Sequence, residues 1–134
     1  MGIEWIFDGG MGTMLPDFEK DESDIRLSCN EYRNLIRPDD VKAVHRAFLS
    51  AGSTVVETNT FGANPIVLSE YGLADLTAEI NEAAVQIAKE AAADFPGARV
   101  AASIGPGSKL PSLGGISVDE CADAYRNVPG FASN

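Results

Sequence analysis

The sequence predicts an α/β fold built on a parallel sheet. Three short apolar runs alternate with longer segments of helical periodicity, an order typical of parallel strands joined by right-handed crossovers. Each run is almost continuously apolar, as expected of strands that are covered on both faces. Glycine or polar residues close each run.

The first apolar run covers residues 3–7, and Asp8, Gly9 and Gly10 close it. Its length and its ending predict a buried strand that leads into a glycine loop. Residues 16–26 then form a polar, irregular stretch, which we expect to be a solvated excursion from the core.

The first helix is predicted over residues 38–49. Pro38 suits the first turn of a helix, and apolar residues follow at helical spacing until Gly52 ends the pattern. The β-branched run at residues 54–56 predicts a second buried strand. Residues 59–65 are then expected to be loop.

A second, longer helix is predicted over residues 73–93, where an apolar stripe coincides with many alanines. Residues 100–104 form the third apolar run and predict a third strand. Ser117 and Glu120 have the spacing of a capping box, so we expect a further helix over residues 118–127.

Composition and charge exclude several classes of partner. Hydrophobic residues make up 45% of the chain, which is typical of a globular protein. The net charge of -10 argues against nucleic acid and against anionic membrane surfaces, because both need Lys and Arg contacts. The N-terminus has no signal-peptide pattern, and no apolar run is long enough to span a bilayer. We therefore expect a cytoplasmic protein with no membrane partner.

The two cysteines, Cys29 and Cys121, lie far apart and have no metal-binding spacing. Two free thiols in a reducing compartment are expected, and a single disulfide is the alternative. His45 lies within the first helical pattern, where we expect a packing or surface role rather than catalysis.

The carboxyl ends of the predicted strands carry the residues with chemistry to offer, and ligands bind at this edge of parallel sheets. Asp8 supplies a carboxylate beside Gly9 and Gly10, whose backbones can approach a ligand and expose N–H groups. These groups suit an amino acid, with the carboxylate on the ammonium and the amides on the α-carboxyl. The alternative is that Asp8 only hydrogen-bonds the following turn.

Polar side chains also follow the second and third strands. Residues 57–60 are four polar residues in a row, and Ser103 ends the third run. We take Glu57, Asn59 and Ser103 as candidate substrate-binding residues. The alternative is a polar network that closes the loops without contacting a ligand.

Seven short motifs, taken together, carry a likeness to a known family. They are residues 6–15 (IFDGGMGTML), 29–31 (CNE), 37–39 (RPD), 57–64 (ETNTFGAN), 70–73 (EYGL), 103–106 (SIGP) and 109–114 (KLPSLG). In this order they resemble the homocysteine S-methyltransferase family, and the likeness is nearest to the homocysteine-binding domain of its cobalamin-dependent branch. Several motifs in the right order are far more specific than any one of them.

The resemblance implies a (β/α)8 barrel of the TIM type, of which this chain would supply the N-terminal portion, about three β/α units. It implies methyl transfer to the thiol of L-homocysteine to give methionine. Zinc would hold the thiolate, and methyl-cobalamin would be the donor in the cobalamin-dependent branch. The family's first-strand loop carries onto Asp8, Gly9 and Gly10, and its second-strand cluster onto Glu57 and Asn59.

The sequence also departs from the family pattern. The family's zinc ligands are cysteines on later strands, and neither cysteine of this chain matches them. Residues 127–134 replace the family's continuation, and we interpret them as a divergent or truncated tail. We therefore expect residues 1–134 to be a partial homocysteine-binding domain that is inactive alone. The alternative is a non-catalytic fragment or half-barrel that self-associates or needs a complementing chain.

Overall fold

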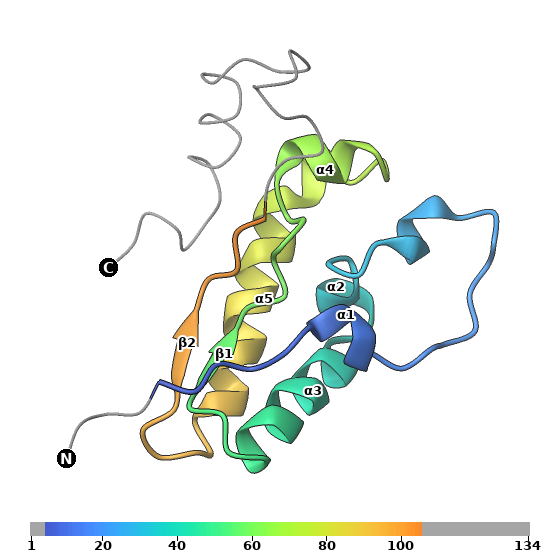
Figure 1. The fold of residues 1–134 in the computed structure, drawn as a ribbon. Coiled ribbons are helices and arrows are strands. Elements are labelled where there is room, and N and C mark those ends of the chain that lie inside the picture. Colours follow the sequence, from blue (N-terminus) through green and yellow to red (C-terminus); the bar gives the residue numbers. More distant parts are fainter. Residues whose placement is uncertain (1–4, 106–134) are drawn as a thin grey trace.

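The structure is a computed structural model that describes residues 5–105 as a small parallel sheet flanked by helices (Figure 1). Strand β1 (Val55–Glu57) pairs in parallel with strand β2 (Arg99–Ala101). Val56 lies opposite Val100 in this register. The parallel sheet and the two predicted strands at these positions are thus confirmed, with β2 shorter than the run that predicted it.

A third segment lies along the other edge of β1 but is not a regular strand. Phe7 makes one isolated parallel bridge to Val55, and the N–H of Asp8 donates to the Val55 carbonyl at 3.1 Å. The prediction of a strand over residues 3–7 is therefore wrong in length, because residues 5–7, the described part of that range, contain one bridge residue and no regular strand. Its place is correct, because the N-terminal segment, β1 and β2 lie side by side in sequence order.

The expectation that all three strands are buried is correct only for β1. Val55 and Val56 are enclosed, whereas Phe7 is 52% exposed and Val100 is only half-buried. The physical reason is position in the sheet. Among the described residues β1 has a neighbour on each side, while the two flanking segments each have one, so their side chains reach solvent.

Two helices pack against each other and against β1. Helix α3 (Pro38–Ser50) has Pro38 in its first turn and is followed by Gly52 at φ +116°, so the predicted helix over residues 38–49 is confirmed. The predicted second helix is divided. A 3-10 turn, η2 (Ala74–Leu76), precedes helix α5 (Thr77–Ala92).

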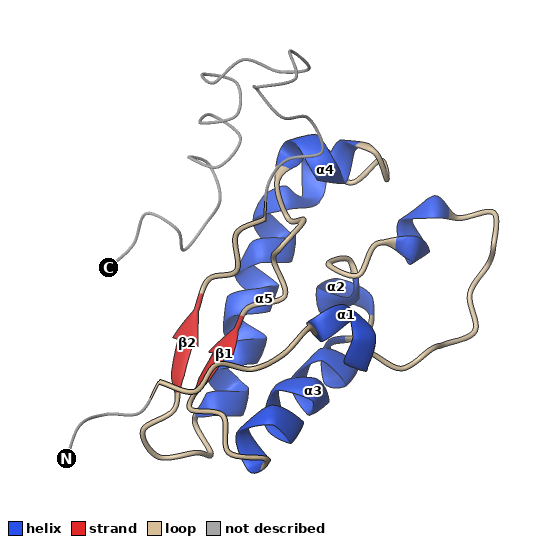
Figure 2. Ribbon diagram, viewed as in Figure 1, coloured by secondary structure: helices blue, strands red, loops and turns tan. Residues whose placement is uncertain are grey.

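Short helical turns occupy segments for which no helix was predicted (Figure 2). They are α1 (Met11–Met14), the 3-10 turn η1 (Ile25–Ser28), α2 (Arg33–Ile36) and α4 (Pro65–Ser69). The start of α4 has a local cause, because the Asn64 side chain accepts from the backbone N–H groups of Ile66 and Val67.

The core lies between the helices and β1. Leu49 of α3, Val56 of β1 and two alanines of α5 form one buried cluster. His45 is fully buried in α3, so of the two roles expected for it, packing and surface, the structure shows packing. No described helix is long and apolar enough to cross a membrane.

Some predictions concern residues outside the described part of the chain. They are the helix over residues 118–127 with its capping pair, Cys121, and the tail over residues 127–134.

Candidate functional site

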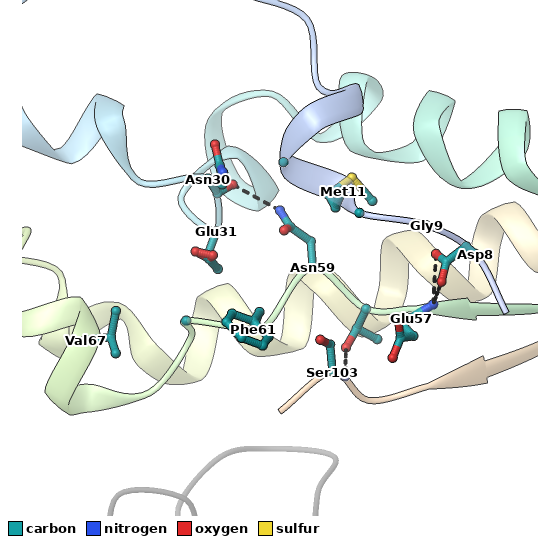
Figure 3. Close-up of a pocket in the computed structure, with 14 residues that line it drawn as sticks. Asp8, Gly9, Met11, Asn30, Glu31, Glu57, Asn59, Phe61, Val67 and Ser103 are labelled. Atoms are coloured by element: carbon teal, nitrogen blue, oxygen red, sulfur yellow. Dashed lines mark hydrogen bonds between the residues drawn. The ribbon is translucent and has the colours of Figure 1, made fainter. Parts of the chain in front are cut away.

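A cavity of about 650 Å³ opens at the carboxyl ends of the strands (Figure 3). Residues from the N-terminal loop, the segment before α2 and the loops after β1 and β2 form its wall. All six residues that the sequence nominated lie on this wall: Asp8, Gly9, Gly10, Glu57, Asn59 and Ser103. Segments far apart in the chain therefore meet at one site, as expected of parallel strand ends.

Asp8 and Glu57 place two carboxylates at one end of the cavity. The Asp8 carboxylate accepts from the backbone N–H of Glu57 at 3.2 and 3.3 Å. The pKa of Asp8 is raised to about 6, first by burial and also by the negative charge of Glu57, against the lowering effect of the Glu57 N–H. Asp8 therefore does more than close its own turn, since it ties the first segment to the end of β1.

The glycines beside Asp8 let the loop pass close to its neighbours. A Cβ at Gly9 would lie 3.1 Å from the ring of Phe48 in α3. The Thr13 hydroxyl donates to the Gly10 carbonyl at 3.1 Å and so closes α1 against the loop. Gly9 thus has a packing reason to be glycine, apart from any ligand.

A ring of hydrogen bonds joins the ends of β1 and β2. The Thr60 hydroxyl donates to the Ser103 carbonyl at 2.8 Å, and the Ser103 N–H donates to the Thr58 hydroxyl at 3.2 Å. The two hydroxyls lie 2.7 Å apart, and Thr58 is the donor because the Thr60 proton is already in use. Ser103 is therefore held in place through its backbone.

Asn59 belongs to a second, buried network. Its side-chain amide donates to the Asn30 carbonyl and to the Asn34 side chain, both at 3.0 Å. The Asn34 amide in turn donates to the Asn59 carbonyl at 2.9 Å and to the Ile80 carbonyl at 3.2 Å. These hydrogen bonds of Asn59 match the alternative interpretation, a polar network that closes the loops. They hold the segment before α2 against the cavity.

Sequence reasoning missed several residues of the cavity wall. Glu31 adds a third carboxylate, and Met11, Phe61 and Val67 add apolar surface. The sole sequence signal for Glu31 was its place in the CNE motif, because no periodicity marks an irregular segment. No Lys, Arg or His is among the described residues of the wall, so the cavity favours a cationic group.

The described residues do not fit the zinc site that the resemblance implies. Among residues 5–105 no group of three or more His, Cys, Asp or Glu could hold a metal ion. The Cys29 thiol is buried, and its pKa is raised to about 11, first by burial and then by the negative charge of Glu31. A thiol of this kind remains protonated at neutral pH and is a poor metal ligand.

Comparison with known proteins identifies the family. A family model described as homocysteine S-methyltransferase matches residues 5–131. The chain belongs to the homocysteine S-methyltransferase family. It is 40% identical over 126 residues to the methionine synthase of Mycobacterium leprae, covering 90% of this chain and 10% of that protein. The methionine synthase of Mycobacterium tuberculosis is 39% identical over the same length, with 11% of that protein covered. The chain thus spans about a tenth of the length of these relatives.

The similarity to homocysteine S-methyltransferases is also seen in the fold of a solved structure. The crystal structure of the homocysteine methyltransferase MmuM from Escherichia coli, in its metallated form, matches with a TM-score of 0.59 and 25% identity. The match covers 76% of this chain and 38% of that protein. The α/β class is therefore supported, and a (β/α)8 barrel remains a prediction.

Proposed function

We propose that this chain binds L-homocysteine in the strand-end cavity, as part of an enzyme that transfers a methyl group to the homocysteine thiol and so forms methionine. One observation carries the proposal: four segments of a homocysteine S-methyltransferase chain converge on a cavity that has carboxylates and, among its described wall residues, no cation. Such a cavity attracts the ammonium group of an amino acid.

Asp8 is the residue that we propose for the ammonium. It lies beside the glycine loop, whose amides would take the α-carboxyl group, and Glu57 adds a second negative charge next to it. Met11 and Phe61 would contact the methylene groups of the side chain. Asn59 would act indirectly, by holding the wall of the cavity in place.

The proposed role of residues 5–105 is binding and orientation. Zinc, when bound, would hold the homocysteine sulfur as a thiolate, and methyl-cobalamin would be the methyl donor, as the sequence resemblance to the cobalamin-dependent branch implies. We propose that groups outside residues 5–105 hold both. On this proposal residues 1–134 are a partial homocysteine-binding domain of a cytoplasmic enzyme.

A second candidate function is a non-catalytic half-barrel that needs a complementing chain. The exposed apolar side chains of Trp5, Ile6 and Phe7 along the edge of β1 favour it, because such an edge is usually covered in a folded protein. This candidate predicts that methyl transfer appears only after a chain that completes the barrel is added.

Ligand titration followed by NMR tests the proposed function. L-homocysteine and 4-mercaptobutyrate share the thiol and the carboxylate, but only the first has the ammonium. Asp8→Asn should weaken binding of L-homocysteine by about tenfold or more, which corresponds to 1.4 kcal/mol, and should leave the weaker binding of 4-mercaptobutyrate unchanged.

Asp17→Asn is the matched control, because Asp17 is exposed and does not line the cavity. It should bind both ligands as the wild type does. Equal binding of the two ligands by the wild type, or no binding of L-homocysteine, would show the proposal to be wrong.

A further inference from the structure

Asn34 lies behind the cavity wall rather than on it. It belongs to α2, is only 2% exposed, and does not line the cavity. Its side chain nevertheless holds a wall residue, because its amide donates to the Asn59 backbone carbonyl at 2.9 Å and its side-chain oxygen accepts from the Asn59 amide at 3.0 Å. One buried partner therefore fixes both the backbone and the side chain of Asn59.

The amide groups of Asn34 and Asn59 use all of their N–H hydrogens. The Asn34 amide also donates to the Ile80 carbonyl of α5 at 3.2 Å, and the Asn59 amide donates to the Asn30 carbonyl at 3.0 Å, the bond drawn in Figure 3. Each amide has two N–H hydrogens, and a backbone carbonyl can only accept, so the orientation of both side chains is fixed. Asn34 thus joins α2 to α5 and to the loop after β1.

The bonds around Asn34 hold two parts of the cavity wall together. Asn59 lies on the loop after β1, which also brings Phe61 to the wall, and Asn30 lies on the segment before α2. A wall that is already formed needs little further ordering when a ligand binds, and such preorganisation increases affinity.

We propose that Asn34 is a positioning residue for the strand-end cavity: through Asn59 it holds the loop after β1 against the segment before α2, so that the wall is formed before a ligand binds. The inference rests on the proposed function, in which Phe61 of the same loop contacts the methylene groups of L-homocysteine.

Truncation of the side chain tests this role. Asn34→Ala should lower the affinity of the folded protein for L-homocysteine by about tenfold in an NMR titration, because the loop must then be ordered by the ligand. Hydrogen exchange of the Asn59 side-chain amide should become faster, since that amide loses its Asn34 acceptor. Asn34→Ser, a milder change that also loses the acceptor, should shift both readouts in the same direction and serves if Asn34→Ala does not fold.

Asn81→Ala is the matched control. Asn81 of α5 is also fully buried, and its amide donates to the carbonyls of Ala63 and Thr77, both at 2.8 Å. Neither of these partners lines the cavity. The control removes the same side chain and as many donated bonds, so it should lower stability in urea denaturation but keep the affinity within about twofold of wild type. Exchange of the Asn59 amide should remain slow.

A double variant tests whether Asn34 acts through Asn59. If it does, Asn34→Ala combined with Asn59→Ala should lose less affinity than the sum of the two single losses, because both changes break the same network. Fully additive losses would overturn the inference.

The remaining outcomes separate this inference from the proposed function. Unchanged affinity in a folded Asn34 variant, or an equal loss in Asn81→Ala, overturns the inference, while binding that still depends on Asp8 leaves the proposed function intact. If L-homocysteine does not bind to the wild type, both are wrong.

Discussion

The strand-end cavity and the helix layer of α3 and α5 both enclose ionisable groups, but the two regions shift them in opposite directions. In the helix layer His45 is fully buried, neither ring nitrogen has a partner among the described residues, and burial lowers its pKa to about 4. In the cavity, burial raises the pKa of Asp8 to about 6. Each shift favours the neutral form of the group.

The difference lies in access. His45 is enclosed by α3 and its neighbours, so a ligand cannot reach it and its neutral ring serves as packing. Asp8 and Glu31 line a cavity, so a ligand with a cation or a donor can compensate them. The proposed binding site therefore lies at the strand ends, and the helix layer contributes the stability that holds the strand ends together.

The largest expected effect is a loss of stability that spares binding. Leu49 of α3 is 5% exposed and packs in a cluster with residues of β1 and α5. Leu49→Ala should lower the free energy of unfolding by about 2–5 kcal/mol, because it removes buried methyl groups and leaves a cavity. Urea denaturation measures this loss, and NMR titration should find the ligand affinity of the folded fraction unchanged.

Leu49→Met is the control, since a change that conserves volume should cost less than about 1.5 kcal/mol. An unchanged urea midpoint in Leu49→Ala, or a loss of ligand affinity as large as its loss of stability, would contradict the division into a stabilising layer and a binding end.

The next effect is the pH dependence of stability, for which the two regions have opposite signs. The pKa of His45 falls from 6.5 to about 4 on folding, so the unfolded chain binds more protons in this range. Its contribution is present above pH 6.5 and is lost as the pH falls toward about 4, by on the order of 1–3 kcal/mol. The pKa of Asp8 rises from 3.8 to about 6, so its effect makes stability fall as the pH rises through that range.

Two variants separate these slopes in urea unfolding between about pH 4 and pH 7. His45→Leu should shift the slope relative to the wild type toward stability that falls with rising pH, because the His45 contribution is lost. Asp8→Asn should shift the slope the other way, because the Asp8 contribution is lost. A variant that kept the wild-type slope would show that the assignment to its group is wrong.

The smallest expected change in stability tests the open edge of the sheet. Phe7→Lys replaces an exposed apolar side chain beside β1, so stability should change by no more than about 0.5 kcal/mol. We expect the wild type to self-associate through this edge, and the added lysine should shift sedimentation toward the monomer.

Ala78→Lys adds the same charge at an exposed position of α5 and should leave the association unchanged. A wild-type chain that sediments as a compact monomer and melts cooperatively would contradict the expectation.

Local sequence signals predicted much of the fold. Pro38 and the helical spacing after it placed α3, and the β-branched run placed β1 within a residue. Asn64 and Pro65 are residues typical of a helix start, and α4 begins there. The helix is only five residues long, so its start is easily interpreted as loop from the sequence. The exposure of Phe7 had no local signal, because an apolar run has the same sequence at the edge of a sheet as at its centre.

The sequence by itself determined the order of the strands and the two long helices, the family, and the carboxylate and glycines at the first strand end, because these depend on local pattern and on motif order. Only the tertiary structure decided that Glu31 shares a cavity with Asp8, and that the amide of Asn59 donates to the segment before α2. These are contacts between segments far apart in the chain. Burial and charge balance follow from such contacts, and no single segment encodes them.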